Sequence, residues 1–144
     1  MKVRFKKLSP NAVMPTKAHP SDAGADIVCT GFEVDDDGNV VCHSGIAVEI
    51  PEGYCGFLFP RSSIAKKDVV LSNAVGVIDC HYRGEVTAKF KPTEPTKHEK
   101  RHIYHAGERM AQLIVLPYPE VEYVESNELS DTDRGEGGYG STGN

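Results

Sequence analysis

Short runs of alternating apolar and polar residues, separated by turn-forming residues, extend along most of the chain. Alternation of this kind is typical of half-buried β-strands. The runs that we expect to form strands cover residues 3–5, 45–50, 53–59, 69–71, 85–90, 112–116 and 121–124. The turn-forming sequence at residues 36–39 lies between two further apolar runs and predicts a β-hairpin. A brief helix is expected over residues 62–67, with Ser62 able to cap it. Many short strands joined by turns predict an all-β sandwich or jelly roll.

Size and charge narrow the possible functions. A chain of 144 residues fits one domain with a real core. Its net charge of −5 argues against sequence-independent nucleic-acid binding, which depends on Lys and Arg neutralising phosphates. No apolar run approaches the length of a membrane span, and the basic N-terminus lacks the apolar stretch of a signal peptide. The four scattered cysteines form no Cys-x-x-Cys pair and predict reduced thiols. We therefore expect a soluble cytoplasmic protein that binds neither nucleic acid nor membranes.

The last segment has a different composition. Residues 131–144 are rich in glycine and contain too few apolar side chains to fold alone, which is typical of a frayed terminus. A second interpretation is functional, because Arg134 and Tyr139 stand among the glycines. The Gly-Ser-Thr-Gly sequence at 140–143 also offers backbone N–H and hydroxyl donors, as phosphate-binding loops do. The sequence thus predicts a β-domain over 1–130 and a flexible arm over 131–144.

Two segments inside the β-domain carry groups that are able to do chemistry. The sequence Pro-Arg-Ser-Ser at 60–63 precedes the predicted helix, and Arg61 with two hydroxyls at a helix N-terminus could bind an anion. An ordinary capped helix with a surface Arg explains the same residues. Asp79 follows an apolar run, where it could act as a general base toward water. An Asp that caps a turn is the alternative.

Two more segments are weak signals alone. Gln112 is a polar residue at the entrance of an apolar strand, and Asp22 and Asp26 flank a small-residue turn. Such a carboxylate pair is more often solvated than bound to a metal.

In chain order, five segments resemble the five motifs of the trimeric dUTPase family. They are residues 22–26, 60–63, 76–84, 107–112 and 134–143. The resemblance runs from near the N-terminus to the last residues. It implies a jelly-roll-like distorted β-barrel with at most one short helix, assembled as a homotrimer with active sites between subunits. It also implies that the Gly-rich arm closes over a site built mainly by other subunits.

The resemblance implies a dUTP diphosphatase, which hydrolyses dUTP to dUMP and pyrophosphate. This activity limits uracil incorporation into DNA and supplies dUMP for dTMP synthesis. Asp79 matches the residue that activates the water attacking the α-phosphorus, and Tyr82 matches the aromatic that leaves no room for a ribose 2′-hydroxyl. The segment matched to uracil recognition through its backbone contains Asn73, Gly76, Val77 and Ile78.

The other implied roles concern the phosphates, the base and the metal. The further positions implied to bind substrate are Arg61, Ser62, Ser63, Gln112, Arg134, Gly140, Ser141 and Thr142. Tyr139 matches the arm aromatic that stacks on the base, where Phe is more usual. Asp26 matches a carboxylate that reaches Mg²⁺ through water, a common way for proteins to hold this ion.

Several alternatives stay open at this point. A dCTP deaminase has a similar fold, but Lys89 stands where that family has its catalytic Glu. A nucleotide-gated regulator of dUTPase fold that acts through protein partners is the other main alternative, and a structural β-barrel is a third. The set His98, His102 and His105 has metal-ligand spacing, yet we expect no native metal site there. We expect His81, close to Asp79 in sequence, to be a surface turn residue.

Overall fold

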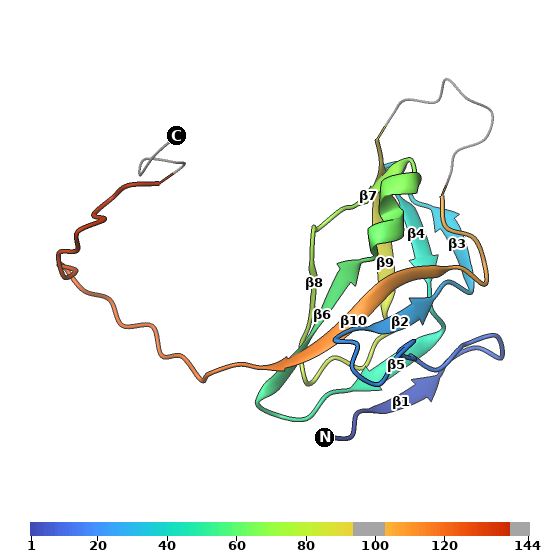
Figure 1. Cartoon of the computed structure of the whole chain (residues 1–144), viewed down its shortest axis with the longest axis horizontal. Coiled ribbons are helices and arrows are strands. Elements are labelled where there is room, and N and C mark those ends of the chain that lie inside the picture. The colour runs from blue at the N-terminus through green and yellow to red at the C-terminus, as the bar shows by residue number, and fades with distance from the viewer. Residues whose placement is uncertain (94–102, 139–144) are drawn as a thin grey trace.

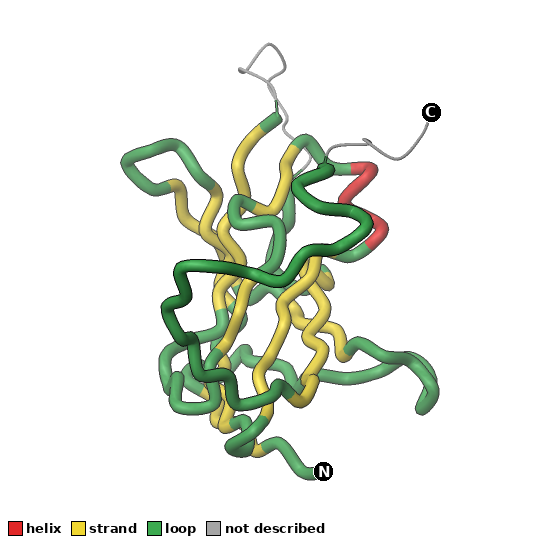
Figure 2. Tube along the Cα trace, turned by 90° about the vertical axis from the view of Figure 1, so that its left-hand side faces the viewer, coloured by secondary structure: helices red, strands yellow, loops and turns green. Residues whose placement is uncertain are grey.

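The computed structural model describes residues 1–93 and 103–138, and its regular structure is almost entirely β (Figure 1). The strands are β1 (Arg4–Lys7), β2 (Ala25–Val28), β3 (Gly31–Val34), β4 (Val40–His43), β5 (Ile46–Glu49), β6 (Tyr54–Pro60), β7 (Val69–Leu71), β8 (Gly76–Ile78), β9 (Thr87–Pro92) and β10 (Arg109–Pro117). One short 3₁₀ helix, η1 (Ser62–Lys66), lies between β6 and β7 and is the red segment of Figure 2. The prediction of an all-β fold with at most one short helix is confirmed.

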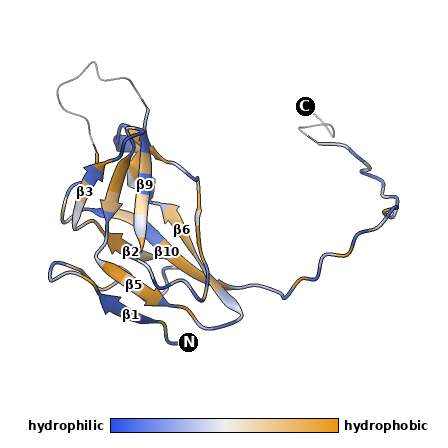
Figure 3. Ribbon diagram, turned by 180° about the vertical axis from the view of Figure 1, so that it is seen from behind, coloured by the Kyte–Doolittle hydropathy of each residue, from blue (hydrophilic) through white to orange (hydrophobic). Residues whose placement is uncertain are grey.

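The strands form three antiparallel sheets around one core. Their orders are β1-β5, β2-β10-β6-β8 and β3-β4-β9-β7, and these sheets do not close into a continuous hydrogen-bonded barrel. Strand β9 shows why the sequence folds this way, because Ala88 and Phe90 are buried while Thr87 and Lys89 are exposed. Figure 3 shows a contrast between neighbouring strands as well: β1 is hydrophilic, and β5 beside it is apolar.

The largest fully buried side chains come from strands of all three sheets and from their connections. Tyr104 and Phe90 lead this core, and their ring centroids are 5.0 Å apart. All four cysteines are buried and free, as predicted. No helix in the described part of the chain is both long and apolar enough to cross a membrane.

The predicted hairpin is present as β3 and β4, which pair from Gly31↔His43 to Val34↔Val40. The carboxylate of Asp35 accepts hydrogen bonds from the backbone N–H groups of Asp37 and Asn39, at 3.1 and 2.8 Å. Gly38 supplies a φ of 79°, which side chains with a Cβ adopt rarely. The turn residues thus form the predicted hairpin through their own local bonds.

Two local expectations were wrong. Residues 121–124 form no strand, because the chain leaves the sheets after Pro117 and Tyr123 is 93% exposed, with no partner strand beside it. Ser62 does not cap the helix, since Arg61 occupies the cap position and no side-chain cap bond forms. The small-residue turn expected around residues 22–26 is present as a bend at residues 23–24, after which strand β2 brings Asp26 into a sheet. The division of the chain at residue 130 stays a prediction.

Candidate functional site

A cavity of about 430 Å³ opens beside strand β8. It is lined by the residues matched to uracil and sugar recognition and by the matched general base: Asn73, Gly76, Val77, Ile78, Asp79 and Tyr82. The structure therefore brings the third predicted segment together around one concave surface. Glu85 and Lys89 line the same cavity and were not predicted as site residues.

Strand β8 is held by one neighbour and leaves its other edge free. It pairs with β6 through Gly56↔Ile78 and Leu58↔Gly76, and it is the last strand of its sheet in the described structure. A Cβ on Gly76 would lie 3.2 Å from the Cβ of Leu58, so glycine permits this close pairing. An edge strand presents unpaired backbone N–H and C=O groups, which can hydrogen-bond a ligand.

The turn before β8 has an unusual backbone. Ala74 has a φ of 58°, the left-handed region that residues with a Cβ adopt at some cost. The N–H of Val75 donates to the carbonyl of Asn73 at 2.6 Å, which tightens the turn further. Backbone strain of this kind is often found where a turn serves binding.

A second turn places Asp79 and Tyr82 next to each other. Asp79 follows β8 directly, and its carbonyl accepts the backbone N–H of Tyr82 at 3.0 Å. The phenol of Tyr82 donates to the carbonyl of Glu85 at 3.0 Å. A Cβ on Gly84 would lie 2.3 Å from the Tyr82 hydroxyl oxygen, so the ring folds over a position that only glycine leaves open. These contacts fix the aromatic ring on the wall of the same cavity that Asp79 lines.

Lys89, which lines this cavity, takes part in an ion pair. Its Nζ lies 2.8 Å from Oδ2 of Asp35, and this hydrogen bond is the main reason that the pKa of Asp35 is lowered to about 2. Lys89 of the cavity wall is thus held in an ion pair, at the position where the dCTP deaminase family has its catalytic Glu.

A second cavity, of about 330 Å³, gathers the other predicted residues of the β-domain. Asp26, Arg61, Ser62 and Gln112 all line it. Sheet register explains this, because Gln112 lies directly opposite Asp26 on β2 and opposite Phe59 on β6. Directly opposed residues project to the same face of a sheet, so segments distant in sequence meet here.

Asp26 is the electrostatic centre of this second cavity. Its Oδ1 lies 2.6 Å from Nε of Arg61, and its Oδ2 lies 3.2 Å from Nη1 of Arg109. The Asp26 side chain is only 14% exposed, so both contacts are partly shielded from solvent. Gln112 donates from Nε2 to the carbonyl of Pro60 at 3.0 Å. Two guanidinium groups gathered around one carboxylate are a good receptor for a phosphate chain, which can compete for both.

Arg109 contacts Asp26 at this site and was not among the site residues predicted from the sequence. The available signal was its position in the fourth matched segment, three residues before Gln112. Ser63 is placed beside the same cluster, with its hydroxyl 3.5 Å from Nη1 of Arg61.

The second cavity has a donor set that suits Mg²⁺ bound through water. Asp26 supplies a carboxylate and Gln112 an amide, the oxygen donors that Mg²⁺ prefers, whereas the Asp22 carboxylate on the same wall already accepts the backbone N–H of His19. The Arg61 and Arg109 contacts occupy both oxygens of Asp26, which fits an outer-sphere role better than direct ligation. Within residues 1–93 and 103–138, no group of three or more His, Cys, Asp or Glu side chains is arranged to hold a metal alone.

The remaining predicted residues lie elsewhere. Arg134 is on the exposed segment after Pro117, where its Nε donates to the carbonyl of Gly137 at 2.9 Å. Figure 1 shows this segment extending away from the sheets. His81 is on a surface turn as expected, 3.8 Å from a carboxylate oxygen of Glu52. The predicted residues that lie outside the described part of the chain are Tyr139, Gly140, Ser141 and Thr142, together with His98 and His102.

The two cavities share no lining residue. One holds the predicted base, sugar and general-base positions, and the other holds the predicted phosphate and metal positions. Within one chain, the described residues therefore supply the parts of a nucleotide site as two separate sets.

Comparison with known proteins identifies the family. Residues 10–143 match the family described as dUTPase. A deoxyuridine 5'-triphosphate nucleotidohydrolase of Hydrogenobaculum sp. is 41% identical, covering 99% of each chain, and one of Thermobifida fusca is 39% identical over 99% of this chain and 79% of its own.

Solved structures agree with the sequence relatives. The dUTPase of Staphylococcus bacteriophage 80alpha with dUPNHPP has a TM-score of 0.81 at 32% identity, covering 99% of this chain and 98% of its own. A variant dUTPase of phage phi11 of S. aureus, described with a structural Mg(II) ion, has a TM-score of 0.76 at 26% identity, covering 91% of this chain and 100% of its own. The match over residues 10–143 and the identity to these relatives show that this chain belongs to the dUTPase family.

Proposed function

We propose that the protein hydrolyses dUTP to dUMP and pyrophosphate. The observation that carries this proposal is the cavity beside β8, where Asp79 and Tyr82 stand next to a free strand edge. Family membership and the relatives named deoxyuridine 5'-triphosphate nucleotidohydrolase support the same activity.

The free edge of β8 supports recognition of uracil. Backbone N–H and C=O groups along residues 73–78 complement the uracil edge, whereas cytosine would leave buried polar groups unpaired. The fixed ring of Tyr82 closes the sugar side of the cavity against a 2′-hydroxyl.

The chemical step is an in-line displacement at the α-phosphorus. The carboxylate of Asp79 accepts a proton from water, the water oxygen bonds to phosphorus, and the bond to the bridging oxygen breaks with release of pyrophosphate. Arg61 and Ser62 are proposed to stabilise the charge that develops on the leaving phosphates. Mg²⁺, held through water by Asp26, would neutralise the triphosphate.

The separation of the two cavities supports an assembly in which neighbouring chains complete each site. We propose a homotrimer, in which the sugar-side set of one chain meets the phosphate-side set of another. The segment from 118 extends away from its own sheets with Arg134 on it, which suits an arm that reaches a neighbour and adds Tyr139, Gly140, Ser141 and Thr142. A cytoplasmic location is part of the proposal, because free buried thiols suit a reducing compartment.

Pyrophosphate release tests this function directly. Purified protein is incubated with Mg²⁺ and dUTP, and in parallel with dCTP, dTTP or UTP. Rapid release from dUTP alone is the expected result. Equal release from all four nucleotides would contradict the recognition assigned to residues 73–78 and Tyr82, and no release by folded protein would contradict the activity itself.

Asp26→Asn is expected to raise the Mg²⁺ concentration needed for half-maximal rate by about tenfold or more, the usual scale for outer-shell metal partners. The change removes the negative charge that Arg61 and Arg109 now share. Initial rates across a Mg²⁺ titration measure the effect, and thermal unfolding shows whether the variant is folded.

Asp22→Asn is the matched control for this titration. Asp22 lines the same cavity, but its carboxylate accepts the backbone N–H of His19 at 2.8 Å, a bond that an Asn side-chain oxygen can keep. We expect a much smaller shift. Equal Mg²⁺ dependence in Asp26→Asn and the parent would remove Asp26 from the metal site.

A further inference from the structure

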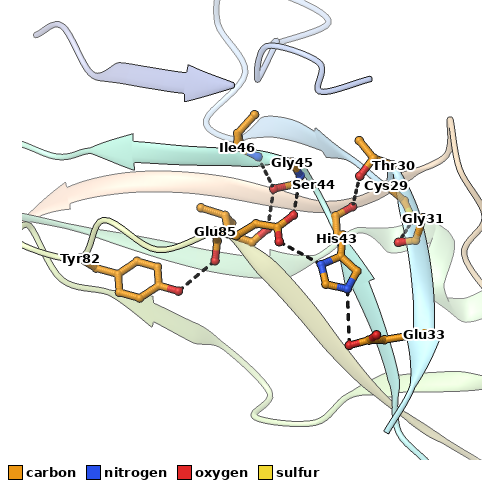
Figure 4. A network of polar contacts seen from close by, with 11 residues as sticks. Cys29, Thr30, Gly31, Glu33, His43, Ser44, Gly45, Ile46, Tyr82 and Glu85 are labelled. Carbon is orange, nitrogen blue, oxygen red and sulfur yellow. Dashed lines mark hydrogen bonds and ion pairs between the residues drawn. The ribbon is translucent and has the colours of Figure 1, made fainter. Parts of the chain in front are cut away.

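Glu85 connects the sugar side of the cavity to the turn between β4 and β5. Its Oε1 accepts the backbone N–H of Gly45 at 2.6 Å, and its Oε2 lies 2.9 Å from Nδ1 of His43. Figure 4 shows His43 on one side of Glu85 and Tyr82 on the other. The Glu85 carboxylate therefore ties the chain directly after Gly84 to the end of β4.

A second pair of bonds holds the next residue to the same turn. The hydroxyl of Ser44 donates to the carbonyl of Val86 at 2.5 Å, and the N–H of Val86 donates to the carbonyl of Ile46 at 2.9 Å. Ser44 is the one polar residue counted among the buried side chains of the described structure. Hydrogen bonds to residues 43–46 thus fix the backbone at Glu85 and Val86.

This fixed backbone is what positions the aromatic ring. The carbonyl of Glu85 accepts the Tyr82 hydroxyl at 3.0 Å, and the Tyr82 ring occupies the space that a Cβ on Gly84 would need. A small displacement of the Glu85 carbonyl would therefore move the hydroxyl end of the ring. The ring forms the cavity wall against which a sugar would pack.

We propose that Glu85 and His43 are positioning residues that hold Tyr82 in place and so set the discrimination between deoxyribonucleotides and ribonucleotides. The inference rests on the proposed function and assigns part of its sugar specificity to two residues outside the five matched segments. Neither residue needs to contact the substrate for this role, because both act through the carbonyl of Glu85.

The pair also gives the specificity a pH dependence. The hydrogen bond to Glu85 is the main cause that raises the pKa of His43, with Glu33 adding to it from 3.7 Å on the Nε2 side. The buried thiol of Cys29 also interacts electrostatically with His43. Because the folded pKa is raised, the ion pair is present at lower pH and is lost as pH rises through the pKa of His43. His43 is 36% exposed at its side chain, so solvent weakens the effect.

The test compares kcat/KM for dUTP with kcat/KM for UTP, using the full-length protein. Glu85→Ala is expected to lower this ratio by about tenfold, the scale of losing one hydrogen bond to a charged group. Its kcat for dUTP should change far less than its KM. Glu85→Gln keeps an acceptor for Gly45 and should recover part of the ratio.

Glu33→Gln is the matched control, because Glu33 faces the other nitrogen of His43 and lines no part of the cavity. We expect its dUTP/UTP ratio at pH 6 to equal that of the parent. In the parent protein, we expect the dUTP/UTP ratio to fall between pH 6 and pH 8 as the ion pair between His43 and Glu85 is lost. His43→Asn keeps a side-chain N–H donor without a titratable charge, so its ratio should stay constant over this range. A ratio in this variant that varies with pH as in the parent would overturn the role of His43.

A double-mutant cycle with Tyr82→Phe separates positioning from general stability. If Glu85 acts through the Tyr82 hydroxyl, the two changes should be strongly non-additive in the ratio. Additive effects, or an unchanged ratio in folded Glu85→Ala, would overturn the proposal. Failure of the parent protein to hydrolyse dUTP would instead contradict the proposed function and is seen before any variant is compared.

Discussion

Asp79→Asn is expected to bind dUTP normally and to lose turnover by about 10²- to 10⁴-fold, the range attributed to general acid–base catalysis. The change keeps the shape of the side chain and removes its capacity to accept a proton from water. Asp79 lies at the end of β8, beside the free strand edge and the fixed ring of Tyr82, so the same cavity holds the carboxylate and the proposed nucleoside pocket. Steady-state pyrophosphate release gives kcat, and calorimetric titration with a non-hydrolysable dUTP analogue gives the dissociation constant.

Asp36→Asn is the control for this change. Asp36 is an exposed carboxylate on the turn between β3 and β4 and lines neither cavity, so turnover should match the parent. Two outcomes would contradict the assignment of Asp79. Turnover at the parent rate would mean that another group activates the water, and parallel loss of binding would mean that the carboxylate mainly holds the sugar.

Local structure was largely predictable because its causes are local. The hairpin between β3 and β4 depends on Asp35 accepting N–H groups from its own turn, and the alternation along β9 depends on which residue faces the core. Both signals are present within a few consecutive residues. The short helix after Pro60 was expected on a local signal as well, although the Ser62 cap proposed for it does not form.

The strand expected at residues 121–124 shows the limit of that approach. Alternation marks residues that suit a half-buried sheet face, but a strand also needs a partner edge. Within one chain, Val121 and Val124 are 55% and 78% exposed. The pattern shows which side chains of the segment could be buried, but it does not identify the surface against which they would pack.

The contacts that build the second cavity depend on sheet register. Asp26 meets Gln112 because β2 and β10 pair antiparallel with these two residues directly opposed. The register shifts between Arg109 and Ala111, and this irregularity accompanies the contact of Arg109 with Asp26. Resemblance to a family could place Asp26, Arg61 and Gln112 in one site, but the Arg109 contact required the folded chain. The link from His43 to Glu85 was equally hidden, since it joins a strand end to a loop.

Removing residues 134–144 is expected to leave a folded protein with turnover reduced by about 10²-fold or more, as small losses of positioning at a reacting centre can cause. The described structure ends its last strand at Pro117 and uses no residue after it in the core. Truncation should therefore leave the temperature of unfolding nearly unchanged. Full activity in the truncated protein would show that the arm does not complete the site.

The proposed assembly makes a sharper prediction about which chain the arm serves. A truncated chain retains Asp79, and a full-length Asp79→Asn chain retains the arm, so each protein alone should be nearly inactive. If the arm covers the site of a neighbouring chain, coexpression should restore activity, because some mixed oligomers combine an intact Asp79 with an arm from the next subunit. Two different affinity tags allow the mixed oligomers to be purified before pyrophosphate release is measured. If the arm instead folds over its own chain's Asp79, every site keeps one defect and the mixture stays as inactive as its parts. Recovery of activity would thus establish both the shared site and the direction in which the segment after Pro117 extends in the assembly.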